Sequence, residues 1–325
     1  MSIQETRFIW MNGELKPWAQ AQVHVLSHAL HYGSAVFEGI RCYETHQGPR
    51  VFRLTDHIQR MYYAARVYQM EIPYAAGELV AATKEVIRVN DLKSAYVRPV
   101  AFKGYGSIGV VGATCPIDVA IATFPWGAYL GEEGLRDGID VCVSSWRRVA
   151  PDTIPAGLKM AGNYLSSQLI SQEAKSRGFA EGIGLSADGL VSEGAGENIF
   201  LVHQGRIITP PAAASILAGI TRDSVIRLAR DLGYQVIEQA IPREMLYIAD
   251  EAFFTGTAAE ITPIRSVDRL PVGSGERPVT TALQDAFFGL FDGRTADRWG
   301  WLEPLEAEVT TITAPGGAAA ASAGE

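Results

Sequence analysis

The sequence has 325 residues, of which 47% are hydrophobic and 20% are charged, and its formal net charge is −8 at pH 7. This length predicts about two domains, and the composition is ordinary for a globular protein with a large core. The negative charge argues against a nucleic-acid backbone or an anionic membrane as the partner, so local arginines would have to attract small anionic substrates.

The first part of the chain, residues 1–126, has the pattern of an α+β domain. Apolar and polar residues alternate on both sides of Asn12-Gly13, a dipeptide that favours a two-residue hairpin turn. Further strands are expected at 34–43, 95–102 and 118–125. Apolar residues at three- and four-residue spacing predict helices over 55–67 and 77–89. The glycine-rich stretch 127–136 lacks such periodicity and is expected to link the two domains.

The second domain is expected to span residues 137–305. Strands are predicted near 139–146, 182–187, 190–202, 206–209, 234–240 and 251–256, and helices near 162–177, 221–232, 242–248 and 278–291. Residues 306–325 have low complexity and are expected to be disordered.

The cysteines and the absence of a long apolar run predict a cytoplasmic location. Cys42, Cys115 and Cys142 are widely spaced and odd in number, so we expect buried, reduced thiols. No apolar run has the length of a membrane span, and the polar first residues are not a secretory signal.

Lys159 has the most unusual surroundings of the six lysines in the chain. It lies in a stretch of small and apolar residues, 153–164, and only Lys103, which lies beside glycines, is a rival. Burial disfavours the charged ammonium, which is how proteins prepare an amine to form a Schiff base with a carbonyl compound. The alternative is a lysine whose stem merely covers apolar surface.

A second unusual segment, 190–202, holds an acidic, glycine-rich turn between two apolar runs. Gly194 and Gly196 would allow a flat ligand to approach, and Glu193 offers a carboxylate. A carboxylate beside a pyridine nitrogen keeps that nitrogen protonated, which is what pyridoxal phosphate requires as an electron sink. The alternative is that Glu193 and Glu197 are solvated acids of a turn.

Two segments could hold a phosphate group. Thr221 is expected to be the N-cap of an amphipathic helix, whose free amides and dipole favour an anion. The turn Thr255-Gly256-Thr257 could form a nest of backbone amides. Together with an amine and an acid, these are the parts that a pyridoxal phosphate site needs.

The chain resembles the class IV, or fold type IV, pyridoxal phosphate aminotransferases, and among them the bacterial branched-chain amino acid aminotransferases. The resemblance extends from residue 9 to about residue 305 and is carried by the surroundings of Lys159 and Glu193 and by segments 25–33, 36–41, 95–99, 124–129, 219–222 and 255–261. It implies an α+β fold of the D-amino-acid aminotransferase type, with a small N-terminal α/β domain and a larger C-terminal domain built on a mostly antiparallel, barrel-like sheet.

The resemblance also implies the reaction and the roles of individual residues. The implied reaction is ping-pong transamination of L-leucine, L-isoleucine and L-valine with 2-oxoglutarate. Lys159 is implied as the catalytic residue that forms the Schiff base. The implied cofactor-binding residues are Arg60, Lys159, Tyr164, Glu193, Leu217, Ile220, Thr221 and Thr257. The implied substrate-binding residues are Tyr32, Phe37, Gly39, Tyr96, Arg98, Val110, Trp126, Tyr129, Thr257 and Ala258.

The loop after residue 103 has two interpretations. Gly104-Tyr-Gly106-Ser-Ile-Gly109 satisfies the G-x-G-x-x-G pattern of nicotinamide dehydrogenases, but no helix is predicted after it and no suitable acid follows at the required distance. The resemblance implies instead that Ile108 and Val110 form the tip of a loop that reaches a neighbouring subunit. We therefore expect a homodimer at least, and relatives form hexamers.

Other functions remain as alternatives. D-amino-acid transaminases and aminodeoxychorismate lyases share the fold, and a scaffold that only binds its ligand could retain the pocket. Segments 96–98 and 124–129 favour the branched-chain enzyme. His24, His28 and His31 are interpreted as hydrogen-bonded packing residues, because neither a carboxylate nor a cysteine accompanies them, and no metal is expected.

Overall fold

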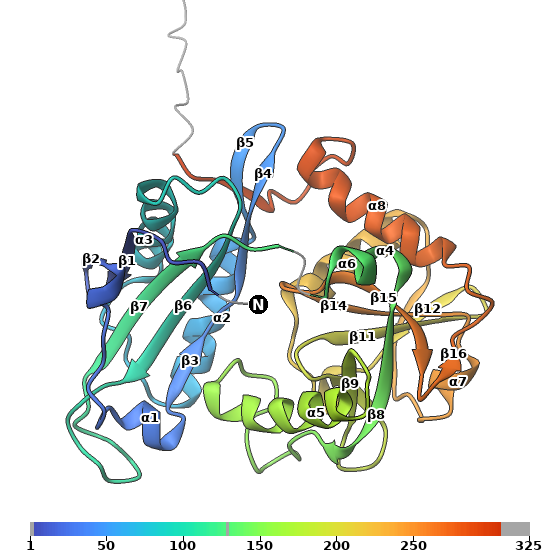
Figure 1. Ribbon diagram of the computed structural model, residues 1–325, viewed down its shortest axis with the longest axis horizontal. Helices are drawn as coiled ribbons and strands as arrows, with labels where there is room; N and C mark the ends of the chain where they lie inside the picture. The colour runs from blue at the N-terminus through green and yellow to red at the C-terminus, as the bar shows by residue number, and fades with distance from the viewer. Residues whose placement is uncertain (1–2, 128–129, 307–325) are drawn as a thin grey trace, which may run out of the picture.

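Two β-sheets, one in each half of the chain, organise the fold, and Figure 1 shows them side by side with helices packed against them. The computed structural model describes residues 3–127 and 130–306. The arrangement is the predicted α+β fold with two sheets. Of the tail expected at 306–325, all but residue 306 lies outside the described residues.

The first sheet has the strand order β17-β5-β4-β6-β7-β1-β2, with β3 paired to β6. It opens with the predicted hairpin of β1 (Phe8–Met11) and β2 (Glu14–Pro17). Asn12 and Gly13 have φ values of 52° and 90°, and positive φ at both positions is what a type I′ turn requires. The long strands β6 (Ala95–Lys103) and β7 (Ile117–Phe124) pair along their full length.

The strand predicted at 34–43 is divided into β3 (Ala35–Phe37) and β4 (Ile40–Thr45), and both pair with β6. A Cβ atom on Gly39 would lie 2.0 Å from the Tyr96 hydroxyl oxygen, so only glycine fits beneath this tyrosine. The break leaves Glu38 between the two strands, where its side chain is completely buried. The sequence did not predict β5 (Gly48–Phe52).

Helices α2 (Leu54–Val67) and α3 (Ala76–Val89) form as predicted and bury their apolar stripes against the first sheet. In α2, the buried side chains recur at three- and four-residue spacing, as in Leu54, Ile58, Met61 and Ala65. A short helix, α1 (His28–Tyr32), comes before β3. The buried His28 bonds to the Ser34 hydroxyl at 2.6 Å and to the Gly109 carbonyl at 2.9 Å.

The second sheet has the order β10-β9-β8-β15-β14-β11-β12-β13, with β16 (Leu270–Pro271) paired to β15, and most of its neighbouring strands are antiparallel. The predicted strands are β8 (Ile139–Arg147), β9 (Glu181–Leu185), β12 (Arg206–Thr209), β13 (Val236–Glu238) and β14 (Glu251–Gly256). The run predicted at 190–202 is two strands, β10 (Val191–Gly194) and β11 (Asn198–His203). The sequence did not predict β15 (Glu260–Val267).

The helices of the second half are α5 (Tyr164–Ser176), α6 (Ile220–Asp231), α7 (Met245–Ile248) and α8 (Pro278–Asp292), close to the predicted ranges. The link between the halves contains a helix that the sequence did not predict. The glycine-rich stretch 127–136 contains most of a short helix, α4 (Glu132–Asp137). Gly131 and Gly138, which both have positive φ, lie at its two ends.

The end of the described chain returns to the first sheet. After α8, strand β17 (Leu302–Pro304) pairs with β5, although the sequence had assigned residues 302–304 to the second domain. In Figure 1 this segment crosses from the helix α8 side to the β4–β5 side. The two halves are therefore tied by the chain at 127–131 and by the segment that leads to β17.

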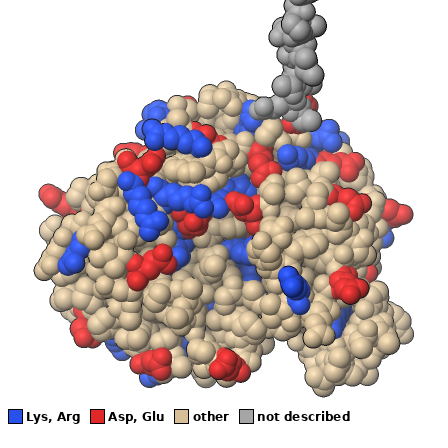
Figure 2. All heavy atoms as spheres, turned by 180° about the vertical axis from the view of Figure 1, so that it is seen from behind, with Lys and Arg blue, Asp and Glu red and all other residues tan. Residues whose placement is uncertain are grey.

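Three features of the described residues bear on the predictions from composition: the cysteines, the apolar length of the helices and the surface charges. All three cysteines are free and buried, as predicted. No helix in the described part of the chain combines the length and the apolar character of a bilayer span. On the face shown in Figure 2, acidic and basic side chains are interspersed, and basic side chains line the hollow between the two halves.

Candidate active site

A cavity of about 240 Å³ lies between the two halves of the molecule. Its lining comes from the first sheet and α2 on one side, and from the loop before α5, the strand ends of the second sheet and the start of α6 on the other. The structure brings together most of the residues that the sequence singled out. These are Phe37, Gly39, Arg60, Tyr96, Arg98, Trp126, Lys159, Tyr164, Glu193, Leu217, Ile220, Thr221, Thr257 and Ala258.

Two of the implied substrate residues do not line this cavity. Tyr32 and Val110 are 44% and 78% exposed and line a separate hollow beside α1. Tyr32 donates a hydrogen bond to the Ile108 carbonyl at 2.8 Å, so helix α1 and the loop are held together away from the cavity. They therefore do not line the pocket of their own chain, and their role in substrate binding stays a prediction. Tyr129 lies outside the described residues.

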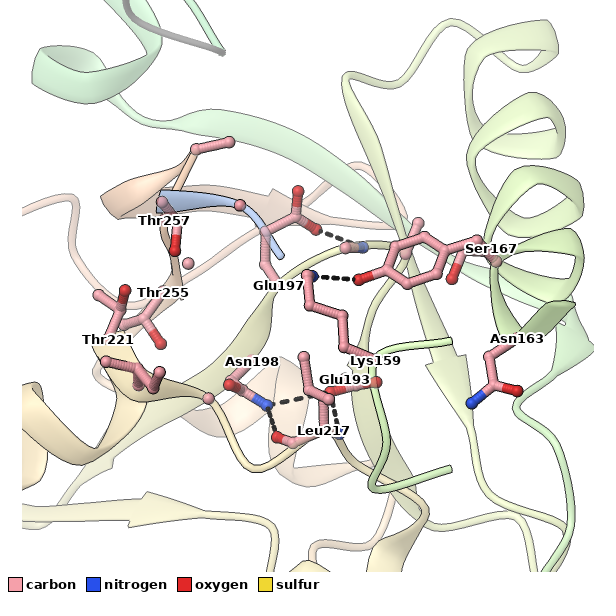
Figure 3. A pocket seen from close by; sticks show the side chains of 18 of the residues that line it. Lys159, Asn163, Ser167, Glu193, Glu197, Asn198, Leu217, Thr221, Thr255 and Thr257 are labelled. Atoms are coloured by element: carbon pink, nitrogen blue, oxygen red, sulfur yellow. Dashed lines mark hydrogen bonds between the residues drawn. The ribbon is translucent and has the colours of Figure 1, made fainter. Parts of the chain in front are cut away.

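Lys159 projects into the cavity from the loop that precedes α5. Its carbonyl accepts a hydrogen bond from the Phe37 amide at 3.2 Å, which fixes the loop against β3. Its Nζ donates to the Tyr164 hydroxyl at 2.6 Å and lies 5.0 Å from the ring centres of Phe37 and Tyr164. Figure 3 shows this bond at the centre of the pocket. An amine is thus held between two aromatic rings with a phenol as its partner.

Glu193, on β10, is a buried carboxylate with partners on both oxygens. The Arg148 guanidinium contacts Oε1 at 2.6 Å, and Oε2 accepts hydrogen bonds from Asn198 Nδ2 and the Leu217 amide, both at 3.0 Å. Burial raises the pKa of Glu193 to about 7, although the charge of Arg148 acts to lower it. The carboxylate is therefore oriented from three directions.

Glu197 is a second buried acid in the lining. Its Oε2 accepts a hydrogen bond from the Gly196 amide at 3.0 Å. Burial and the nearby charge of Glu181 raise the pKa of Glu197 to about 8. The pocket therefore favours the neutral, protonated form of this side chain near pH 7.

Arg60 reaches the cavity from α2, and the buried Glu38 holds its guanidinium. Arg60 Nε and Nη2 each contact a Glu38 oxygen at 2.7 Å, and His57 Nδ1 lies 2.7 Å from the same carboxylate. Burial acts to raise the pKa of Glu38, but the charges of Arg60 and His57 outweigh it and hold this pKa well below its usual range. Arg60 Nη1 also donates to the Ala218 carbonyl at 2.9 Å, beside the start of α6.

Helix α6 begins at Ile220, with Gly219 as its N-cap and without a side-chain cap. The prediction that Thr221 is the N-cap is wrong. A Cβ atom on residue 219 would lie 2.0 Å from Asn198 Oδ1, and this close approach requires glycine. The amides of the first helical turn have no intrahelical partners, so they are available to an anion.

The opposite side of the cavity combines an arginine with aromatic rings. Arg98 Cζ lies 4.9 Å from the Phe37 ring centre, and Arg98 Nη2 donates to the Tyr96 hydroxyl at 3.1 Å. The Tyr96 and Trp126 rings lie 4.7 Å apart. This wall can receive an apolar side chain and still offers a cation to a carboxylate.

The sequence did not predict three polar residues of the site. Glu38 carries the one local signal, because an acid inside an apolar strand-like run requires a buried partner. Asn198 follows directly after the acidic turn but has no distinctive pattern of its own. Arg148 contacts a carboxylate 45 positions away, and nothing in its local sequence indicates this.

Comparison with known proteins decides the family, because the model of the amino-transferase class IV family matches residues 35–267. The chain belongs to the class IV aminotransferases. It is 54% identical over 307 residues to the branched-chain-amino-acid aminotransferase of Escherichia coli K12, covering 94% of this chain and 99% of that one.

Two crystal structures of branched-chain aminotransferases resemble this structure closely. The Escherichia coli branched-chain amino acid aminotransferase has a TM-score of 0.92 at 54% identity, over 93% of this chain and 100% of that chain. The enzyme from Thermobaculum terrenum, solved in its pyridoxal phosphate form, has a TM-score of 0.86 at 36% identity, over 93% and 99% of the two chains.

The interpretation of residues 104–109 as a dinucleotide-binding G-x-G-x-x-G motif fails, since no helix forms in the described segment 104–116.

The residues of the cavity fit pyridoxal phosphate, the cofactor of class IV aminotransferases. The Thr255 hydroxyl is buried at the cavity wall and has no hydrogen-bond partner among the described residues. Figure 3 shows Thr221, Thr255 and Thr257 gathered on one side of the pocket, near the start of α6. Unpaired donors at a helix start suit a phosphate group. An amine at Lys159 and a buried carboxylate at Glu193 supply the other two contacts that the cofactor needs.

Proposed function

We propose that this protein is a branched-chain-amino-acid aminotransferase, which exchanges the amino group of L-leucine, L-isoleucine or L-valine with 2-oxoglutarate by a ping-pong mechanism. The reaction is the last step of branched-chain amino acid synthesis and the first step of degradation. The similarity to the branched-chain enzymes, which extends over nearly the whole chain, carries this proposal.

The proposed cofactor contacts are those that the resemblance to the family implies, at residues that line the pocket. Lys159 forms the covalent bond to pyridoxal phosphate, and Tyr164 and Glu193 contact the phenolic oxygen and the ring nitrogen. Leu217 packs on the ring face. The phosphate is held by Arg60 and by the group Ile220, Thr221 and Thr257. The cofactor, when bound, supplies the electron sink that makes the substrate Cα proton acidic.

The proton transfers are assigned to Lys159. Its Nζ takes the proton from the substrate Cα as general base and then, as general acid, donates it to C4′ of the cofactor. Tyr164, 2.6 Å away, keeps Nζ in place between the two aromatic rings. A carboxylate at Glu193 preserves the protonated ring nitrogen during these transfers.

The pocket has to accept two unlike side chains. The aliphatic side chain of leucine, isoleucine or valine packs against Phe37, Trp126 and Tyr129, and one methylene group changes the binding free energy by only about 1–3 kcal/mol. The second carboxylate of glutamate is bound by Arg98 with the Tyr96 hydroxyl. Gly39 leaves room for Tyr96, and the amides of Thr257 and Ala258 take the α-carboxylate.

The proposal includes a homodimer at least, with a homohexamer as the larger assembly. Tyr32 and Val110, which lie away from the pocket of their own chain, then complete the pocket of a neighbouring copy together with Ile108. The enzyme is proposed to act in the cytoplasm, which agrees with its three free thiols.

A panel of half-reactions tests the proposed function. The holoenzyme is mixed with L-leucine, L-isoleucine, L-valine, D-alanine or aminodeoxychorismate, and loss of the cofactor absorbance band is followed in each case. We expect rapid loss with the three L-amino acids and regeneration of the band by 2-oxoglutarate. Reaction confined to D-alanine or to aminodeoxychorismate would assign the protein to one of the other activities of this fold.

A further inference from the structure

The contact between Arg148 and Glu193 is a buried ion pair directly beneath the cofactor pocket. The two side chains are 5% and 6% exposed, and Arg148 Nη2 lies 2.6 Å from Glu193 Oε1. An ionised carboxylate has about four lone-pair positions. Arg148, Asn198 and the Leu217 amide occupy three of them, which leaves one for the ring nitrogen of a bound cofactor.

Arg148 is itself fixed from several sides. Its amide donates to the Leu185 carbonyl at 2.8 Å, which anchors the backbone at the end of β8 to β9. Its Nη1 donates to the Ser167 hydroxyl on α5 at 2.9 Å. A Cβ atom on Gly184 would lie 3.0 and 3.1 Å from Arg148 Cγ and Cδ, so the arginine stem lies across a glycine. These contacts hold the Arg148 guanidinium against the Glu193 carboxylate.

The other charges around Glu193 do not replace this contact. Lys159 and Arg222 act on Glu193 without a hydrogen bond to it, and Arg222 Nη2 is bonded to Glu238 at 2.8 Å. Glu197 and Glu181 are buried nearby and disfavour additional negative charge. Among the described residues, Arg148 is the only cation in direct contact with the Glu193 carboxylate.

We propose that Arg148 is a positioning residue for the transamination: its guanidinium keeps the Glu193 carboxylate ionised and aimed at the ring nitrogen of the cofactor. This inference rests on the proposed function, because that function gives Glu193 its role. A neutral Glu193 would lack the negative charge that holds the ring nitrogen protonated, and the electron sink would weaken. Arg148 thus acts on the reaction through Glu193 and does not touch the substrate.

The pH dependence of one half-reaction tests the proposal. Arg148→Met keeps an unbranched, flexible stem and removes the charged guanidinium, so the pKa of Glu193 rises and the carboxylate becomes ionised only at higher pH. We expect the acid limb of the single-turnover rate with L-leucine to move upward by about one pH unit, which corresponds to about a tenfold loss of rate on that limb. The rate should recover as the pH is raised.

Two comparisons separate this role from general structural damage. Arg147→Met makes the same replacement at the adjacent, exposed arginine, and it should leave the acid limb in place. In the Glu193→Gln background, Arg148→Met should lower the rate by less than about threefold, because residues that act through one contact are not additive. A uniform loss at every pH, or an undiminished loss in that background, would overturn the proposal.

A second variant covers the case in which Arg148→Met does not fold. Gly184→Ala crowds the arginine stem, and also Ile170 Cδ1 at 2.9 Å, without removing any charge. It should likewise move the acid limb upward, and an unmoved limb would contradict the proposal. Turnover of L-leucine by the unmodified holoenzyme is measured first. If that turnover is absent, the proposed function itself fails, whereas turnover with an unmoved limb refutes the role of Arg148 alone.

Discussion

At the scale of single residues, Lys159 has the contacts expected of an amine that forms a covalent bond. Among the described residues, its Nζ has one hydrogen-bond partner, Tyr164, and it faces two aromatic rings. The rival lysine is differently placed, because Lys103 Nζ donates to the Val111 carbonyl at 2.6 Å in an exposed loop. The two lysines therefore make a matched pair for a labelling experiment.

Replacing Lys159 with alanine should abolish the covalent attachment of pyridoxal phosphate and lower turnover by several orders of magnitude, because the same amine moves the Cα proton. Borohydride reduction followed by peptide mapping should place the label on Lys159 in the unmodified protein. Lys103→Ala should retain the label and the activity. A label on Lys103, or near-normal turnover by Lys159→Ala, would remove this assignment.

The buried acids make a prediction about stability. Glu197 has an ordinary pKa of 4.5 that burial and Glu181 raise to about 8 in the folded protein. The folded state therefore binds this proton more tightly than the unfolded state, and stability falls as the pH rises from about 5 to about 8. Glu193 contributes in the same direction up to about pH 7. Glu38, with its lowered pKa, acts only at lower pH.

Glu197→Gln should flatten this pH dependence in the apoprotein by on the order of 1–3 kcal/mol between pH 5 and pH 8. Calorimetric unfolding over that pH range provides the measurement. Glu14→Gln, at an exposed position on β2, serves as the control and should leave the slope unchanged. An equal slope for Glu197→Gln and the unmodified protein would show that Glu197 is not the group that titrates.

The site residues that the sequence singled out differ in a physical way from those that it did not. Lys159 and Glu193 stand out because an amine or an acid among small and apolar residues is anomalous within a short window. Arg148 and Asn198 are ordinary in their own segments and acquire their roles from contacts made by folding. A local pattern indicates a group that needs a partner, but it does not name the partner.

At the scale of elements, the sequence predicted whether a segment is a helix or a strand better than it predicted where a strand is interrupted. The runs at 34–43 and 190–202 were each assigned to strand without a break. The first is interrupted at Glu38-Gly39 and the second at its acidic, glycine-rich turn. Strand β15 contains Pro263, which pairs with Phe253 in the interior of the second sheet. Proline is typical of edge strands, so its presence weakened the strand pattern.

Gly219, at the start of α6, leaves room for Asn198, and Asn198 in turn holds the Glu193 carboxylate. Gly219→Ala would bring a Cβ atom to within 2.0 Å of Asn198 Oδ1, while Asn198 Nδ2 bonds to Glu193 and to the Leu217 carbonyl. We expect a loss of about 1–3 kcal/mol in stability, because Asn198 must move and leave buried groups unpaired. We also expect weaker binding of pyridoxal phosphate.

Equilibrium titration of the apoprotein with pyridoxal phosphate, together with urea unfolding, measures both effects. Gly77→Ala is the control, since a Cβ atom there meets nothing within 4 Å at an exposed position of α3. That change should be neutral or stabilising by up to about 1 kcal/mol. Unaltered affinity in Gly219→Ala would mean that Asn198 can shift without disturbing Glu193.

At the scale of the whole molecule, the two halves are joined through buried polar and apolar contacts. Arg53, at the start of α2, donates to Asp223 at 2.6 Å and to Ser224 at 2.9 Å in the first turns of α6. An apolar cluster also crosses the boundary and includes Tyr43 and Phe52 from the first half. Because the interface is hydrophobic and continuous with the core, we expect the halves to behave as one body.

Trp301 is the side chain on which this coupling can be tested. It is 4% exposed, its ring lies 5.8 Å from the Phe52 ring, and its carbonyl accepts a hydrogen bond from the Arg53 amide at 2.7 Å, just before β17 joins the first sheet. Trp301→Ala should cost about 3–5 kcal/mol of stability because it opens a cavity at the boundary.

Urea unfolding of Trp301→Ala is monitored by far-ultraviolet circular dichroism and by release of the cofactor. Both signals should show a single transition at a lower urea concentration than in the unmodified protein. The coincidence is expected because the cluster belongs to both halves and the cofactor site lies between them. Trp146→Ala, at a side chain that is 50% exposed, should change the free energy of unfolding by less than about 1 kcal/mol. Separate transitions in the unmodified protein would instead show that each half has its own stability and that β17 is only a covalent tether.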